Sequence, residues 1–410
     1  MSSPILKTIV KFSSEHKDAL TLSLSDTPLR YITALAYAIF PIIIASLYNE
    51  WVAGLIFGIV NLFQAFILNP IVGGYSDYYG SKPILLLNRI AIVLGGLLWF
   101  FFPMNNLYLI LGFVSLLFLS YSFRINETYL LRITKKNEGG VIFGIAENLF
   151  SIAYFFATLS IAFFSITEHH KIAATVMIIF GVCSFFSLHS IQNDIDPLRK
   201  KTHKKITTKS LLNPIFAVKR AIHFIKLNNN YPLMTLAASC FQGIFYGTIW
   251  FVFPLHLVEL GISSVEGGLQ LGVYELVTIF IAGISGYLAD KYNWRHIHSF
   301  GWFLILLGVA LMPFFVWPLS LIIIGAIIGV GNNLFYFAAE HALEAYDIDH
   351  KEDGEFMAIN KMVGDFSYGI SPILVGFLYF KYGFQSSLIF SSLISGSIAL
   401  WMIWLTYKIK

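Results

Sequence analysis

Six ionisable side chains lie inside long apolar stretches of this sequence, where a charge is costly unless it is paired or has a function. The two deepest are Glu275 and Asp365, and the others are Arg124, Glu127, Glu147 and Lys361. Ionisable groups inside a lipid bilayer pair with one another or line water-filled paths. We therefore expect these residues to form ion pairs, to carry protons or to bind a charged solute.

Glu275 and Asp365 differ in their sequence surroundings. Helix rise places Asp365 ~16 Å and Glu275 ~14 Å from the nearer ends of their predicted helices, which is close to the middle of a bilayer. Lys361 lies one turn before Asp365 and can neutralise it, whereas Glu275 has no cation within its own helix. A desolvated carboxyl favours its protonated form. Glu275 is therefore our candidate for proton coupling or for binding a cationic solute; the alternative is a neutral residue that hydrogen-bonds to a neighbouring helix.

The shallower charges suggest pairs between adjacent helices. Arg124 and Glu147 are predicted at similar depths on two helices that form a hairpin, and Glu127 lies one turn from Arg124. In the second half of the chain, Lys361 occupies the position that corresponds to Glu147. These charges either work in transport or form fixed ion pairs that hold each hairpin together.

Amide and aromatic side chains are the remaining candidates for a binding site. Seven of them lie within predicted spans: Asn61, Gln64, Gln242, Tyr246, Trp250, Asn332 and Asn333. Such a lining can hydrogen-bond a small polar solute or stack on a ring, although amides also bridge transmembrane helices. We predict that these residues form the substrate-binding set.

The composition requires a lipid environment for the elements that carry these residues. The chain has 410 residues, 57% of them hydrophobic and 12% charged, against about 25% charged residues in soluble domains. Twelve apolar runs are long enough to cross a bilayer. They fall near residues 29–48, 51–72, 84–102, 107–131, 141–164, 172–191, 233–256, 266–288, 297–315, 319–344, 355–380 and 384–407.

The distribution of basic residues predicts the orientation of these runs. With both termini in the cytoplasm, 23 of the 27 Lys and Arg residues lie on or next to the cytoplasmic side, the exceptions being Lys171, Lys381, Arg124 and Lys361. Residues 1–28 are expected to be a cytoplasmic lead-in. Residues 192–232 are too polar to cross a membrane and carry nine basic residues. This segment is interpreted as a basic cytoplasmic linker, with a surface-lying amphipathic helix or a solvated chain as the two forms.

The two halves of the chain repeat each other. The segment "GGYSDYYGSKP" at 73–83 resembles "GYLADKYNWRH" at 286–296. An offset of 213 pairs Gly73 with Gly286, Asp77 with Asp290, Lys82 with Arg295 and Glu127 with Glu340, and an offset of 214 pairs Gly140 with Gly354 and Tyr154 with Tyr368. The sequence therefore predicts six helices in residues 1–191, the linker at 192–232 and six helices in 233–410, with a substrate site between the halves.

The pattern formed by Gly73, Asp77, Gly80 and Lys82 resembles the signature loop of the major facilitator superfamily. The second copy keeps Gly286, Asp290 and Arg295. The usual arginines of the motif are absent, since Tyr78 and Ser81 occupy their positions. The resemblance implies an all-α integral membrane protein with twelve transmembrane helices in two pseudo-symmetric six-helix bundles. It also implies that these seven residues form a gate, in which Asp77 faces the N-terminus of helix 11; the alternative is that Asp77 caps its own following helix.

The function predicted from these features is secondary active transport of a small solute, coupled to protons, by a monomer in the cell membrane. Drug–proton antiport is the first alternative, although the fifth span has no Gly or Pro from Glu147 onward, where that signature is rich in both, and a non-transporting receptor is the remote one. An enzyme is not expected, since neither a P-loop nor an HExxH motif occurs. No cofactor, metal site or nucleic-acid partner is predicted.

Overall fold

The structure is a computed structural model, and it describes residues 17–101, 125–126, 129–130, 139–160, 170–191, 231–262, 264–314, 318–345 and 353–408. The described elements are helical. In the N-terminal half they are α2 (Lys17–Leu47), α3 (Glu50–Phe63), a π-helical turn (Gln64–Leu68), α4 (Asn69–Tyr79), α5 (Ser81–Phe101), α7 (Gly139–Ser160) and α8 (His170–His189). In the C-terminal half they are α11 (Tyr231–Glu259), α12 (Ser264–Lys291), α13 (Trp294–Leu311), a 3-10 turn (Met312–Phe314), α14 (Pro318–Ala345), α15 (Asp353–Tyr382) and α16 (Phe384–Lys408).

The described helices confirm the all-α membrane fold. Within the described residues, seven segments are long and apolar enough to cross a membrane: Glu50–Leu68, Ser81–Phe101, Leu233–Glu259, Trp294–Phe314, Ile322–Ala339, Ile359–Tyr382 and Phe384–Lys408. Large apolar side chains such as Phe280, Phe314 and Leu393 point out of the molecule, as expected for a surface in contact with lipid. The fourth predicted span falls almost entirely outside the described residues, so the count of twelve stays a prediction, and so does the linker at 192–232.

The first helix begins earlier than the sequence predicted. Residues 17–28 belong to α2, so the predicted start of this helix near residue 29 was wrong, whereas residues 1–16 of the predicted lead-in lie outside the described residues. Asp26 is fully buried within this segment. Hydropathy does not distinguish a charged residue that is paired inside the protein, such as Asp26, from one that is exposed to water. The start of the helix was therefore predicted too late in the sequence.

The segment 73–83 is mostly helix rather than loop. Helix α4 continues to Tyr79 and α5 begins at Ser81, so the turn is confined to Gly80, whose φ is 93°. A left-handed φ favours glycine at this position. A second turn of this kind occurs at Gly383 (φ 81°) between α15 and α16. We call the end of the helix bundle that contains the first turn the Gly80 end, and the end that contains the second turn the Gly383 end.

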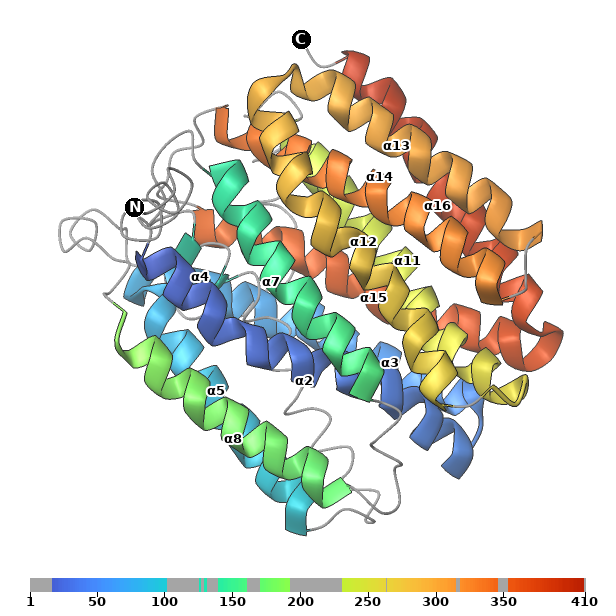
Figure 1. Cartoon of the computed structure of the whole chain (residues 1–410), viewed down its shortest axis with the longest axis horizontal. Helices are drawn as coiled ribbons and strands as arrows, with labels where there is room; N and C mark the ends of the chain where they lie inside the picture. Colours follow the sequence, from blue (N-terminus) through green and yellow to red (C-terminus); the bar gives the residue numbers. More distant parts are fainter. Residues whose placement is uncertain are drawn as a thin grey trace, which may run out of the picture.

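Several contacts among the described helices join the N-terminal half to the C-terminal half. Helix α3 and its continuation α4 pack against α15, α7 runs alongside α12, and α2 contacts α11 (Figure 1). Within the halves, α5 packs on α8, and α13 packs on α14 and α16. The helices that meet between the halves therefore form the centre of the protein, and α5, α8, α13 and α16 support them from outside.

Small residues let the two halves approach each other closely. A Cβ atom on Gly54 would lie 2.3 Å from the carbonyl oxygen of Pro372, and one on Gly58 would lie 2.5 Å from that of Gly369, near the Gly383 end. At the Gly80 end, a Cβ on Gly144 would lie 3.2 Å from the Cα of Gly283. The halves therefore touch near both ends of these helix pairs.

Candidate functional site

A cavity of about 250 Å³ lies between the two halves. Helices α2, α3 and α7 form one side, and α11, α12, α14 and α15 form the other. Its lining is Arg30, Thr33, Ala34, Tyr37, Asn61, Glu147, Tyr154, Ser239, Gln242, Gly243, Tyr246, Trp250, Glu275, Thr278, Asn332, Asn333, Tyr336, Lys361, Gly364, Asp365 and Tyr368. The cavity therefore combines ionisable groups with amides, hydroxyls and aromatic rings.

Six of the seven residues predicted to bind substrate line this cavity: Asn61, Gln242, Tyr246, Trp250, Asn332 and Asn333. On the C-terminal side the amides form a chain of hydrogen bonds. Gln242 Nε2 donates to Asn332 Oδ1 over 3.2 Å, and Asn332 Nδ2 donates to Tyr246 Oη over 3.4 Å. Asn333 Nδ2 is bound by Thr278 Oγ1 at 3.2 Å and by the carbonyl of Gly329 at 2.8 Å. These bonds fix the positions of the amides that face the cavity.

Gln64 is the member of this set that does not line the cavity. It is fully buried and begins the π-helical turn that joins α3 to α4. A π-helical turn inserts an extra residue and rotates the helix face. Gln64 therefore belongs to the buried join between α3 and α4 rather than to the cavity wall.

Four of the six predicted coupling residues line the cavity: Glu147, Glu275, Lys361 and Asp365. Glu147 on α7 and Glu275 on α12 come from opposite halves and lie close enough to repel each other when both are ionised. Glu275 also lies close to Ser151, one turn after Glu147 on α7. The two acids thus form a pair across the interface between the halves.

The other two of these four residues belong to one helix. Lys361 Nζ contacts Asp365 Oδ1 one turn further along α15. The second oxygen of Asp365 accepts a hydrogen bond of 2.8 Å from Asn69 Nδ2 on α4. Asp365 therefore ties the halves together and is already bound by a cation. Among the residues that the structure describes, no group of three or more His, Cys, Asp or Glu side chains could hold a metal ion.

The internal repeat is visible in the cavity wall. Glu147 and Lys361, Tyr154 and Tyr368, and Asn61 and Glu275 are pairs separated by 214 positions, and all six residues line the cavity. Equivalent positions of the two repeats therefore face the same central space. The charge differs between the repeats in two of the three pairs, since Glu147 corresponds to a lysine and Glu275 to an asparagine.

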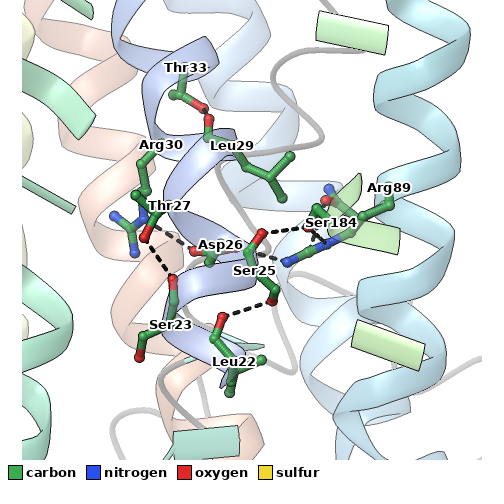
Figure 2. A network of polar contacts seen from close by, with 11 residues as sticks. Leu22, Ser23, Ser25, Asp26, Thr27, Leu29, Arg30, Thr33, Arg89 and Ser184 are labelled. Atoms are coloured by element: carbon green, nitrogen blue, oxygen red, sulfur yellow. Dashed lines mark hydrogen bonds and ion pairs between the residues drawn. The ribbon is translucent and has the colours of Figure 1, made fainter. Parts of the chain in front are cut away.

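A buried charge network lies beside the cavity (Figure 2). The sequence analysis did not predict it. Asp26 on α2 accepts from Arg89 Nη2 on α5 at 2.9 Å and from Arg30 Nε at 3.3 Å. Arg89 Nε donates to Ser184 Oγ on α8 over 3.2 Å, and Ser184 Oγ donates to the carbonyl of Ser25 over 2.6 Å. Asp26 and Arg89 are fully buried, and Arg30 is 8% exposed. The signal that was missed is the i, i+4 spacing of an acid and an arginine directly before the first apolar run.

The predicted gating residues have local roles where the structure describes them. Gly80 forms the turn described above. Lys82 Nζ donates to the backbone carbonyls of His189, at 3.0 Å, and Ile191, at the end of α8. Arg295 lies beside the ring of Trp294, with 5.5 Å from Cζ to the centroid. Gly73 and Asp77 lie in α4, and Gly286 and Asp290 in α12; the side chains of Asp77 and Asp290 are not described, so the gate stays a prediction.

Two further predicted residues, Arg124 and Glu127, lie outside the described residues. The expected pairing of Arg124 with Glu147 therefore stays a prediction.

Comparisons with known proteins agree with this architecture. The family model of the Major Facilitator Superfamily matches residues 29–347. A probable nitrate transporter, NarT, of Staphylococcus haemolyticus (strain JCSC1435) is 25% identical over 178 residues, which are 40% of this chain and 43% of that protein. The chain thus matches less than half the length of this relative.

Two solved structures share the fold over nearly their whole lengths. The human organic anion transporter MFSD10 (TETRAN) superimposes with a TM-score of 0.73 at 13% identity, covering 96% of this chain and 99% of that one. A D-xylose–proton symporter superimposes with a TM-score of 0.67 at 12% identity, covering 95% and 97%. With the family model matching more than three quarters of its residues, this chain belongs to the major facilitator superfamily, whose members are multi-pass membrane transporters of small molecules.

Proposed function

We propose that this protein is a secondary active transporter that moves a small solute by alternating access and couples the movement to protons. The observation that carries the proposal is the polar cavity between the two halves. Its wall is divided between the halves, so a rocking motion of one half against the other would open it to either side. Its volume and many hydrogen-bonding groups suit a small polar solute.

The named relatives support a small polar solute as the substrate class. One is a probable nitrate transporter, one an organic anion transporter and one a D-xylose–proton symporter. Drug–proton antiport is the second candidate, favoured by the six aromatic side chains of the lining: Tyr37, Tyr154, Tyr246, Trp250, Tyr336 and Tyr368. Transport assays with nitrate, D-xylose and the lipophilic cation tetraphenylphosphonium separate the two candidates.

The acid pair formed by Glu147 and Glu275 is the proposed site of proton coupling. Two carboxylates repel each other when both are ionised in a buried place, and a bound proton relieves the repulsion. Because the acids stand on opposite halves, a motion that separates or hydrates them would change their hold on the proton. Asp365 is less suited to this role because Lys361 and Asn69 already bind its two oxygens.

Alternating access is tested by cysteine accessibility from the two sides of the membrane. We expect a single cysteine at Ser239, in a background with Cys183 and Cys240 replaced by serine, to react with an impermeant maleimide from either side of oriented vesicles. Gly58→Leu should shift this reactivity towards the Gly383 end, because a side chain at position 58 would collide with α15 and prevent closure there.

Ile59→Phe is the matched control for Gly58→Leu. Ile59 is the next residue of α3 and is 60% exposed on the outer face, so added bulk there should leave the two reactivities unchanged. Reactivity from one side only, in the wild type and in Gly58→Leu alike, would refute alternating access through this cavity.

We propose that the protein lies in the cell membrane and that both of its termini are in the cytoplasm. The excess of Lys and Arg on one side of the predicted spans supports it. Epitope tags placed at each terminus should be protected from external antibody in intact cells and become accessible after permeabilisation. An externally accessible C-terminal tag would reverse the proposal.

A further inference from the structure

We propose that Arg30 is the anion-binding residue of the central cavity, held in place by Asp26 and Arg89, and that the transported solute carries an anionic group such as a carboxylate. The inference rests on the proposed transport function and names the substrate class for the same cavity. It begins from the position of Arg30, which is buried, faces the cavity and is held on its protein side by Asp26.

The guanidinium of Arg30 is fixed by contacts of three kinds. Asp26 accepts from Nε at 3.3 Å. The ring of Phe150 on α7 covers the guanidinium, with 4.2 Å from Cζ to the ring centroid. The side chain also lies close to Tyr154, another residue of the cavity wall. A guanidinium has five N–H donors in a rigid, planar arrangement that matches the two oxygens of a carboxylate, and pre-organisation of this kind reduces the entropy lost on binding.

The charge of the network favours an anion over a neutral solute. Asp26 is shared by Arg30 and Arg89, and arginines stay charged in proteins. These three residues by themselves therefore carry one positive charge in surplus. Arg89 is fully buried and does not line the cavity, so only Arg30 presents this charge to a solute. Buried charges interact strongly because the surrounding dielectric constant is low.

The other charges of the cavity link anion binding to protons. Glu147 and Glu275 weaken the attraction for an anion when they are ionised, and each proton that they bind strengthens it. The remaining titratable or charged groups of the lining are Tyr37 on α2, Tyr154 on α7, Tyr246 on α11, Tyr336 on α14, and Lys361, Asp365 and Tyr368 on α15. Lys361 and Asp365 compensate each other. Anion affinity should therefore rise as the pH falls, which is the direction required for symport of an anion with protons.

The test measures binding of acetate, lactate and benzoate to the purified full-length protein in low-chloride buffer, by thermal shift and calorimetry. Glucose and tetraphenylphosphonium serve as neutral and cationic comparisons. At least one carboxylate should bind the wild type. Arg30→Gln should weaken it by about tenfold or more, as expected for loss of a charged hydrogen bond, and Arg30→Lys should weaken it less.

Variants of Arg89 test the charge without touching the cavity wall. Arg89→Gln leaves Asp26 paired with Arg30 and removes the surplus charge, so we expect affinity to fall by about threefold or more. Arg89→Lys should retain most of it. Ser184→Ala removes the hydrogen bond from Arg89 to an uncharged hydroxyl, leaves the charge of the network unchanged, and should leave the affinity within about twofold of the wild type. Gel filtration and circular dichroism establish that each variant is folded.

The inference is overturned if none of the three carboxylates binds the wild type, or if Arg30→Gln and Arg89→Gln bind them as tightly as the wild type does. Cysteine accessibility at position 239 distinguishes this failure from failure of the proposed function. Access from both sides, together with absent or Arg30-independent anion binding, would eliminate the anion and leave the transporter.

Discussion

Replacing Asp26 with asparagine will destabilise the protein by about 3–5 kcal/mol, the usual cost of removing one partner from a buried ion pair. The substitution keeps the size of the side chain and removes its charge. It leaves Arg30 and Arg89 facing each other's charge inside the protein without the carboxylate that they share. Because this network joins α2 to α5 and α8, the loss should also reduce the folded yield. Thermal unfolding in detergent, followed by a thiol-reactive dye, measures the change.

Two further variants show whether the loss comes from the charge network. Asp18→Asn removes an acid in the first turn of the same helix, at a partly exposed position, and should change stability by about 0.5 kcal/mol or less. The double variant Asp26→Asn/Arg89→Gln removes one charge of each sign and should recover part of the loss, giving a coupling energy between the two sites. Equal stabilities for Asp26→Asn and Asp18→Asn would show that the network does not stabilise the fold.

The internal repeat allows much of the site to be predicted from the sequence. The offset of 214 makes Tyr154 and Tyr368 equivalent positions, and both line the cavity. The same offset relates Glu147 to Lys361 across the two halves. A repeat places its equivalent residues around the axis between the two copies, so a match at functional positions carries three-dimensional information that hydropathy alone lacks.

The parts that could not be predicted depend on contacts between helices. Hydropathy set the start of the first span at residue 29, and Asp26 was assigned to water because its partner Arg89 lies 63 positions away in the sequence. Pairing across that distance is a property of the packed helices. The π-helical turn at Gln64 is a local irregularity of the same kind, since no residue pattern separated it from the regular helix that contains Asn61.

The close packing between the halves could not be predicted from the sequence either. Glycines at positions 54 and 58 could have served many purposes in an apolar helix. Only the structure shows that they face Pro372 and Gly369 of α15 at distances too short for a side chain. The predicted gate at 73–83 concerned the opposite end of the same helix pair, since α4 continues α3 along α15. The contact between these helices therefore extends from the Gly383 end to the region in which the sequence placed the gate.

Replacing Glu275 with glutamine will abolish proton-driven accumulation of the solute while sparing exchange of solute for solute. Glutamine resembles the protonated acid in shape and cannot release a proton. Glu275 is 7% exposed and faces Glu147 across the two halves, so the substitution also removes the repulsion that makes the pair responsive to protons. The measurement is uptake and counterflow in proteoliposomes under an imposed pH gradient, with whichever of nitrate, D-xylose, the three carboxylates and tetraphenylphosphonium the wild type transports.

Glu147→Gln is the matched variant, because it removes the other acid of the pair from the opposite half. If the two carboxyls act on one proton, each single variant should lose accumulation and the double variant should behave like either of them, since residues that act as a unit are strongly non-additive. If Glu147 instead serves only to pair with a cation of its own half, Glu147→Gln should reduce the folded yield and leave the pH dependence of transport intact. Accumulation by Glu275→Gln with the pH dependence of the wild type would exclude Glu275 and move the coupling role to Asp365, the acid of the cavity wall that lies outside the pair.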